Sequence, residues 1–233
     1  MMVFEMNTIQ SERAKYASSD GQVSLKGTEM IEETTRLESP VEVMYLIHKA
    51  LRAEAARVEK MVGQLETGES LQPFRAAFNL WASALGYHAE KEDKHMTVPL
   101  TDPPQARENE EAHRALERRI EDVLACLNGE IGKTRLIART QRHLFGAVVA
   151  LRIAQDDHLE EEEAFVLPLV REHLSEEQQM EVVRQLLVDE DAQDQRWILD
   201  WVAKELAPTE RGLLAKLEAR FEEVSSRPAS VET

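Results

Sequence analysis

The chain of 233 residues lacks several features that would place a protein in a class by composition alone. Its one cysteine, Cys126, excludes an internal disulfide framework and a zinc finger built on cysteine pairs. No uninterrupted apolar stretch approaches the roughly 20 residues that cross a bilayer. The first residues, Met-Met-Val-Phe-Glu-Met, form neither a basic head nor an apolar signal segment. We therefore expect a soluble protein of the reducing cytoplasm.

Positive charge is also scarce in this sequence. Lysine and arginine number 28 against 44 aspartates and glutamates, which gives a formal net charge of −16 at pH 7. A surface of this sign repels the phosphates of nucleic acids and anionic lipid headgroups. We therefore expect neither nucleic acid nor membrane among the partners.

The sequence does contain strong helical periodicity. Apolar residues recur at helical spacing over four long segments, which run roughly over 39–65, 71–100, 103–127 and 134–172. No segment alternates with a period of two, so no strands are expected. Four long helices joined by short connections predict an all-α, up-down antiparallel four-helix bundle. Three shorter helices are predicted at 175–188, 190–206 and 208–225.

This pattern divides the chain into four predicted parts. Residues 1–37 are polar and aperiodic, and we expect a flexible arm there. The bundle follows at 38–174, a helical extension at 175–226 and a disordered tail at 227–233. Two capping sequences mark helix starts, Ser39-Pro-Val-Glu42 for the bundle and Ser175-Glu-Glu-Gln178 for the extension.

The most informative motif is a lone histidine followed by His-x-x-x-Glu, which occurs twice. An imidazole and a carboxylate four residues apart lie one turn apart on one helix face. Four histidines and two glutamates directed at one interior point can hold two metal ions. The six residues are His48, His88, Glu92, His113, His158 and Glu162.

Energetics favour a metal at these residues. Both His-x-x-x-Glu motifs extend apolar stripes that must face the core, and a buried, unpaired carboxylate costs several kcal/mol or more. Neither stripe carries an Arg or Lys one turn away on the same face that could neutralise the glutamate. Nitrogen and oxygen donors without a thiolate suit iron, manganese or zinc. The competing interpretation, in which each glutamate reaches solvent at the edge of its stripe, is weakened by the repetition.

The choice of glutamate in the second motif rests on the first. Residues 160–163 are all glutamate. Around an ideal helix, Glu162 lies about 40° from His158 and Glu161 about 60° away on the other side, so counting alone does not decide between them. In the first motif the offset of three is Lys91, and only the offset of four is a carboxylate. We therefore choose Glu162 and keep Glu161 and Glu163 as alternatives.

With these motifs, residues 38–175 resemble the hemerythrin-like, or HHE cation-binding, domains. The most specific part is a His-x-x-x-Glu motif followed within a few residues by Pro-Leu. The matching runs are Ser39-Pro-Val-Glu-(x5)-His48, Tyr87-His-Ala-Glu-Lys-Glu92-Asp-(x5)-Pro99-Leu100, Glu110-Glu-Ala-His113 and His158-Leu-Glu-Glu-Glu162-Glu-(x4)-Pro168-Leu169.

The resemblance implies a non-haem di-iron pair, bridged by two carboxylates and an oxygen atom, inside a four-helix bundle. The four histidines named above would be terminal ligands, and Glu92 and Glu162 would be the bridges. The oxygen-carrying members have a second histidine on the third helix, where this chain has Asn109 or Glu117 at the corresponding spacings from His113. Their fourth helix uses His-x4-Asp. This chain is therefore more similar to bacterial HHE proteins, and to the iron-sensing domain of a eukaryotic F-box protein, than to the carriers.

Further side chains near the motifs stay open as contributors. Glu117 is a candidate seventh donor, although a solvated position is favoured. Tyr45 and Tyr87 flank ligand positions and are candidates to contact a metal-bound group or to pack in the bundle wall. His95 follows Glu92 by one turn and either supports a ligand or covers the end of the bundle.

The function expected from this reading is binding of, or reaction with, a small ligand such as dioxygen, peroxide or nitric oxide. Sensing, redox defence and iron homeostasis all fit the six residues, and an oxidoreductase activity is left open. The alternative is a non-catalytic regulatory protein that binds a protein partner through residues 175–226. Exposed apolar surface around Trp197 and Trp201 would favour that alternative, and their burial would favour a structural cap.

Overall fold

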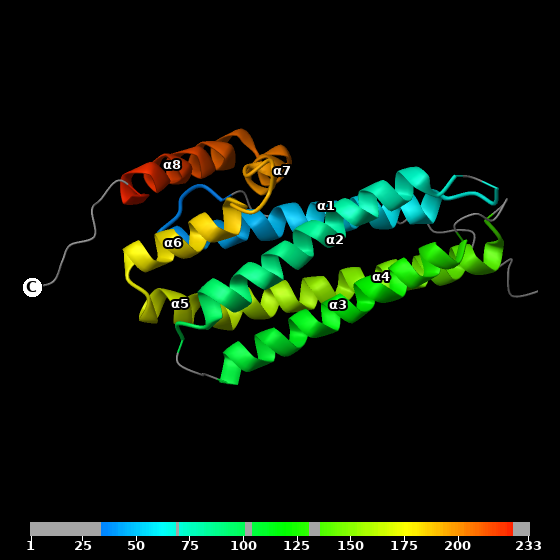
Figure 1. Ribbon diagram of the computed structural model, residues 1–233, viewed down its shortest axis with the longest axis horizontal. Helices are drawn as coiled ribbons and strands as arrows, with labels where there is room; N and C mark the ends of the chain where they lie inside the picture. Colours follow the sequence, from blue (N-terminus) through cyan, green and yellow to red (C-terminus); the bar gives the residue numbers. More distant parts are fainter. Residues whose placement is uncertain (1–33, 69, 101–103, 131–135, 226–233) are drawn as a thin grey trace, which may run out of the picture. The chain divides into compact units, whose positions relative to one another are not determined.

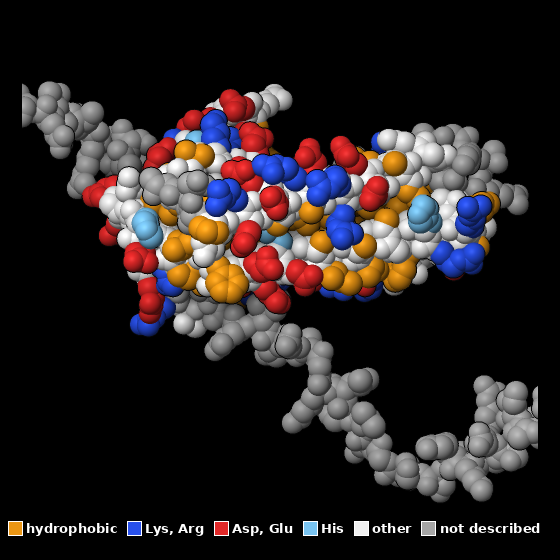
Figure 2. All heavy atoms as spheres, turned by 90° about the horizontal axis from the view of Figure 1, so that it is seen from below, with side chains coloured by type: hydrophobic (Ala, Val, Ile, Leu, Met, Phe, Trp, Pro, Cys, Tyr) orange, Lys and Arg blue, Asp and Glu red, His pale blue; other side chains and the backbone are white. Residues whose placement is uncertain are grey.

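The computed structural model describes residues 34–68, 70–100, 104–130 and 136–225, and all regular structure in these ranges is helical. Residues 1–33 of the predicted arm and the whole predicted tail, 227–233, lie outside the described residues. In this part of the chain, no helix combines the length and the apolar character that crossing a membrane would require. On the face shown in Figure 2, acidic and basic side chains are interspersed, with hydrophobic side chains between them.

Four long helices form the bundle that the periodicity predicts. They are α1 (Met44–Gln64), α2 (Gln72–Lys91), α3 (Pro104–Glu130) and α4 (Ala138–Glu161). Helix α1 packs against α2 and α4, and α3 packs mainly against α4 (Figure 1). The core includes the fully buried side chains of Leu51, Phe78, Trp81, Val148 and Leu151. The all-α bundle expected from the sequence is confirmed.

Two of the long helices do not continue as regular α-helix. Helix α2 passes into a π-helical turn, η2 (Glu92–Thr97), and α4 passes into a second one, η3 (Glu162–Val166). Helix α5 (Leu167–His173) follows η3, with Pro168 in its first turn. A π-turn holds more residues per turn than an α-helix, so it changes the direction of every later side chain. The sequence predicts continuous helices over 71–100 and 134–172, with a kink near Pro168 in the second one, and it does not predict the π-helical turns.

The start of the bundle differs from the predicted cap. Residues Pro40–Val43 form a short 3₁₀ helix, η1, and the Ser39 hydroxyl makes no capping hydrogen bond. The Glu42 carboxylate instead accepts from the backbone N–H of Glu38 at 2.6 Å and from Arg171 at 2.7 Å. The helical segment thus begins where the sequence predicts, with Ser39 at the N-cap and Pro40 in the first turn. The side-chain capping hydrogen bond is absent, and a tertiary ion pair engages the Glu42 carboxylate instead.

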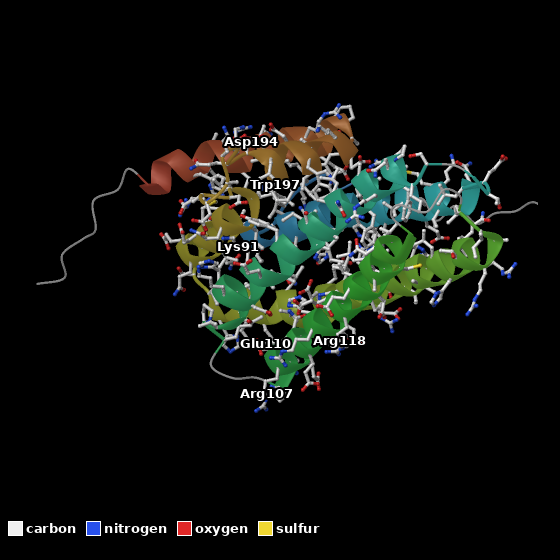
Figure 3. All side chains as sticks on the ribbon, turned by 45° about the vertical axis from the view of Figure 1, so that its right-hand side comes forward. Lys91, Arg107, Glu110, Arg118, Asp194 and Trp197 are labelled. Carbon is white, nitrogen blue, oxygen red and sulfur yellow. The ribbon has the colours of Figure 1, made fainter. Side chains whose placement is uncertain are left out.

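Three helices follow the bundle, and one of them is shorter than expected. They are α6 (Glu176–Leu187), α7 (Trp197–Glu205) and α8 (Pro208–Ser225). The capping box of Ser175 and Gln178 is confirmed. Helix over 190–196 is not observed, because Asp189 closes a turn there: its N–H donates to the Gln195 carbonyl at 2.9 Å, and its carboxylate accepts from Trp197 Nε1 at 2.8 Å. Figure 3 shows Trp197 and Asp194 at this turn.

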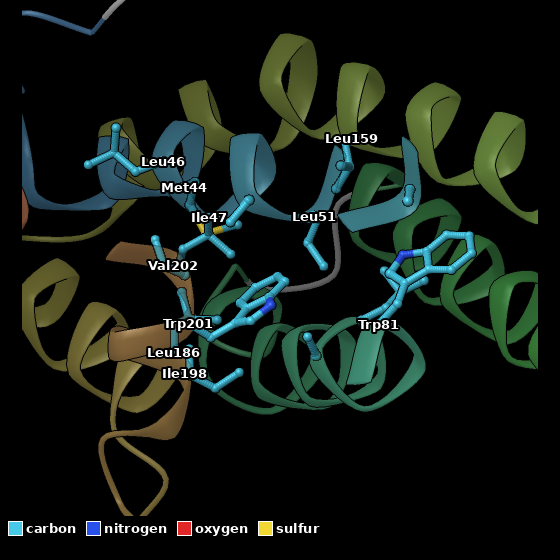
Figure 4. Close-up of a cluster of buried hydrophobic side chains, with 14 of the residues drawn as sticks. Met44, Leu46, Ile47, Leu51, Trp81, Leu159, Leu186, Ile198, Trp201 and Val202 are labelled. Atoms are coloured by element: carbon cyan, nitrogen blue, oxygen red, sulfur yellow. The ribbon is translucent and has the colours of Figure 1, made fainter. Parts of the chain in front are cut away.

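The C-terminal helices cover the bundle. Helix α7 packs on α1, and its side chains Ile198, Trp201 and Val202 join the same buried cluster as Met44 and Ile47 (Figure 4). Trp201 is only 5% exposed. Burial of this tryptophan supports the reading of the extension as a structural cap.

Candidate metal centre

The six residues predicted from the sequence converge inside the bundle. Each long helix contributes one histidine, and each π-turn contributes a glutamate as its first residue. All six side chains are buried, with at most 6% of any residue exposed. The histidines are His48 on α1, His88 on α2, His113 on α3 and His158 on α4, and the glutamates are Glu92 of η2 and Glu162 of η3.

The six side chains form two groups of four that share both glutamates. One group joins His48 and His88 to the glutamates, and the other joins His113 and His158 to them. Within each group the candidate ligand atoms lie within 4.8 Å of one another. Each group therefore offers two imidazole nitrogens and two carboxylate oxygens, a donor set that suits a first-row transition metal.

Each glutamate directs a different oxygen at each group. Glu92 places Oε1 3.1 Å from Nε2 of His88 and Oε2 3.3 Å from Nε2 of His113. Glu162 places Oε2 3.3 Å from Nε2 of His48 and Oε1 3.7 Å from Nε2 of His158. This geometry allows both carboxylates to bridge two cations.

The hydrogen-bonding state of these atoms tests whether metals fit. Nε2 of every one of the four histidines, and both oxygens of Glu92 and Glu162, are buried without a hydrogen-bond partner. Native structures leave few buried polar atoms unpaired, because each one costs about 1–3 kcal/mol. Cations bound among these eight atoms would satisfy them, so the residues fit a metal site.

Two further carboxylates orient the histidines from outside the cluster. Nδ1 of His48 lies 2.7 Å from Glu163, and Nδ1 of His113 lies 2.8 Å from Asp93. Arg52 holds Glu163 in turn, at 2.8 Å. A carboxylate on Nδ1 fixes the ring so that Nε2 faces inward, as is common for histidines that bind metals.

Sequence reasoning missed the role of Asp93 and misplaced that of Glu163. Each of them directly follows a glutamate of the cluster in the sequence. An acidic residue therefore follows both His-x-x-x-Glu motifs, and this repeated pattern could have indicated their role. The structure turns Glu163 toward His48, leaves Glu161 exposed and buries Glu162 completely. Of the three alternatives, only Glu162 lies in the cluster.

Burial sets the protonation of the site. It lowers the pKa of His88 and of His158 to about 4, so both imidazoles are neutral at pH 7, the form that binds metals. Burial and the nearby Glu162 raise the pKa of Glu92 well above its ordinary value. Burial also opposes ionisation of Glu162, but contacts with Glu92 and the histidines hold its pKa well below the ordinary value. The two neighbouring carboxyls therefore differ in acidity, with Glu92 the weaker acid.

The other sequence candidates lie outside the two donor groups. The Tyr87 hydroxyl donates to the Gln185 carbonyl at 2.7 Å, and its ring packs edge-on against Trp197. Glu117 is exposed, and Tyr45 and His95 are half-buried. Among the described residues, none of these four joins the groups of candidate ligand atoms.

Comparison with known families agrees with this geometry. The family model described as the hemerythrin HHE cation binding domain matches residues 39–170, more than half of the chain. The chain therefore belongs to the hemerythrin HHE cation-binding family. Comparison with curated proteins and with solved structures gave no match. Family membership and the buried cluster together indicate a metal-binding helical protein.

Proposed function

We propose that the six clustered residues hold a non-haem pair of iron ions, and that the protein binds or reacts with a small ligand such as dioxygen, peroxide or nitric oxide. The observation that carries this proposal is the set of eight buried, unpaired donor atoms, four of which belong to two shared carboxylates. A set of nitrogen and oxygen donors without a thiolate suits iron, and manganese and zinc also bind such donors. The family resemblance favours iron.

The coordination count supports binding of an external ligand. The histidines and the two bridging carboxylates supply eight donor atoms, against about twelve positions of two six-coordinate ions. A bridging oxygen would take two more. Positions therefore remain for a small ligand, and an iron pair, when bound, supplies electrons that can be exchanged with it.

The protein's own residues prepare this chemistry. Asp93 and Glu163 hold two imidazoles in the orientation that presents Nε2 inward. Metal binding needs the ionised carboxylate of Glu92, whose pKa burial raises, so protons compete with metal at this residue. The apolar side chains of Leu85, Leu116 and Leu159 are nearly inaccessible and belong to the core that keeps bulk water out.

Rapid mixing tests the proposed reactivity. The reduced, iron-loaded protein should change its absorption spectrum when mixed with dioxygen, hydrogen peroxide or nitric oxide. Oxidation of the iron is expected in place of a long-lived, reversible oxygen adduct, because the second histidine of the oxygen carriers is missing. A fully reversible adduct would show that the protein is a carrier, and inertness toward all three ligands would contradict the proposal.

A role in sensing, in redox defence or in iron homeostasis would each use this same metal centre. The regulatory alternative, in which residues 175–226 bind a protein partner, gains no support from the tryptophans, since Trp201 is buried and Trp197 packs against Tyr87.

A further inference from the structure

A cavity of about 360 Å³ lies between α2 and α3 and borders the metal centre. Its wall includes His113, a member of one donor group, which is only 6% exposed and whose Nε2 has no hydrogen-bond partner. Asp93, whose carboxylate contacts Nδ1 of that histidine, lines the cavity as well. A second cavity, between α3 and η3, is lined by Glu108 and Glu161 but by none of the six clustered residues. The cavity between α2 and α3 is therefore the one that leads to a candidate metal ligand.

The charged side chains of this cavity are mostly acidic. Glu90, Asp93 and Glu117 line it together with one basic residue, Arg114. Glu90 and Glu117 are exposed, and neither forms an ion pair within the described part of the chain. Arg114 donates to Glu110 at 2.8 Å, so its charge is already compensated. A hollow with excess negative charge raises the local concentration of cations and repels anions.

Gly86 leaves space at the wall of the cavity. It lies inside α2, where glycine destabilises a helix relative to alanine. Its backbone does not need glycine, since the positive φ recorded among the described glycines belongs to Gly68. No close neighbour requires it either, because a Cβ added at Gly86 meets no atom within 4 Å. A side chain at this position would take up space beside the cavity that the glycine leaves open.

The two donor groups differ in how their outer carboxylates are held. Glu163 contacts His48 and is also bound by Arg52 at 2.8 Å. The Asp93 carboxylate contacts His113, and no basic side chain of the described residues holds it as Arg52 holds Glu163. The group that contains His113 is therefore the half of the centre that lies beside the cavity and is less firmly enclosed.

We propose that divalent metal cations enter and leave the centre through the cavity between α2 and α3, and that Glu90 and Glu117 draw them into it. The cavity joins negative charge at exposed positions to a buried imidazole of the donor set. This assignment rests on the metal binding of the proposed function, but it does not depend on which small ligand the bound metal takes.

Release of iron from the reduced, iron-loaded full-length protein to an excess of chelator tests the route. Gly86→Phe places a large side chain at the cavity wall and should slow release severalfold, and Gly86→Ala should slow it less. Gly146→Phe makes the same change at an exposed glycine of α4 that also has no atom within 4 Å of an added Cβ, so its release rate should match the wild type. Iron content after full loading should be unchanged in all three variants, because the donors are intact.

Anaerobic uptake of ferrous iron by the chelator-stripped protein tests the charges. The double variant Glu90→Gln/Glu117→Gln keeps the side-chain size and removes two negative charges. Its initial rate of uptake should be about fivefold lower at low ionic strength, and added salt should reduce the difference. Glu111→Gln/Asp122→Asn removes the same charge from exposed positions of α3 that do not line the cavity, and it should take up iron at close to the wild-type rate.

The outcomes separate the route from the proposed function. Failure of the wild-type protein to bind iron would overturn both. With normal iron binding, wild-type rates in Gly86→Phe and in Glu90→Gln/Glu117→Gln would overturn the route alone. Equal slowing by the two control variants would also overturn it, because the effect would then come from any helix substitution or from net charge. The glutamine variants change only exposed side chains, so they decide the question if Gly86→Phe does not fold.

Discussion

Glu92 and Glu162 each serve both halves of the centre, and no other described side chain contributes to both groups of donors. Removing either carboxylate therefore deprives two candidate metal positions at once. Glu92→Ala and Glu162→Ala should each lose most of the bound metal, as measured by elemental analysis of the purified variants.

The neighbouring glutamates supply a matched control for this prediction. Glu161 is exposed, so Glu161→Ala should retain wild-type metal content. Loss of metal in Glu161→Ala together with retention in Glu162→Ala would show that the register assigned to this turn is wrong.

Asp93 and Glu163 act on the centre through the histidines that they contact. Asp93→Asn and Glu163→Gln keep the side-chain size but weaken the hold on Nδ1, so metal affinity should fall about 10–100-fold, as for other partners of metal-bound histidines. Competition with a chelator measures this change. Asp157→Asn and Glu160→Gln, at exposed positions of α4, should have no effect, and equal affinity in all four variants would contradict the orienting role.

At the scale of elements, the positions of the long helices follow from the periodicity of apolar residues and are predicted. The π-helical turns depend on the register of backbone hydrogen bonds and are not predicted. The spacing of apolar residues located α1 to α4, and the repeated His-x-x-x-Glu motif indicated which residues come together. The π-turns η2 and η3 carry no distinct composition, since only the hydrogen-bond pattern distinguishes them from α-helix. The turn at 190–196 was missed because the backbone N–H of Asp189 and its carboxylate close it through partners six and eight residues away.

The contacts of Asp93 and Glu163 lay beyond prediction for a related reason. Both carboxylates pair with histidines on other helices, 20 and 115 residues away in sequence. Periodicity indicates which face of a helix is buried. It does not indicate which neighbouring helix a polar side chain at the edge of that face will contact.

Helix α8 is tied to α1 through one buried ion pair. The Glu210 carboxylate accepts twice from Lys49, both at 2.8 Å, and also accepts from the backbone N–H groups of Ala207 and Thr34. Glu210→Ala leaves Lys49 and these N–H groups unpaired, so the free energy of unfolding should fall by about 2 kcal/mol in urea titrations at pH 7. Glu121→Ala, at an exposed position of α3, should change it little.

The same carboxylate predicts a pH dependence. Burial acts to raise the pKa of Glu210, but Lys49 and the backbone donors outweigh it and hold the pKa below its ordinary value. The stabilisation is therefore present above the unfolded-state pKa of about 4.3 and is lost as the pH falls through the lower folded-state value. Glu210→Gln should show a weaker loss of stability between pH 5 and pH 3 than the wild type, and identical slopes would contradict this account.

At the scale of the whole molecule, the metal centre is expected to hold the four long helices together. Each helix contributes one histidine, so bound metal links all of them, whereas the metal-free protein keeps eight unpaired buried atoms. With metal at about a thousandfold excess over its Kd, binding adds about 4 kcal/mol to stability, which corresponds to roughly 10 °C in Tm for a chain of this size. Scanning calorimetry before and after chelation measures the shift, and equal melting curves would contradict metal binding at these residues.

The number and kind of metal ions per chain test the central claim most directly. Protein purified after expression in iron-supplemented medium should contain close to two irons per chain by elemental analysis, with near-ultraviolet charge-transfer bands in its absorption spectrum. Circular dichroism should show the helical fold in the same sample. A folded protein without metal, or with one ion per chain, would contradict the account of a paired centre bridged by Glu92 and Glu162.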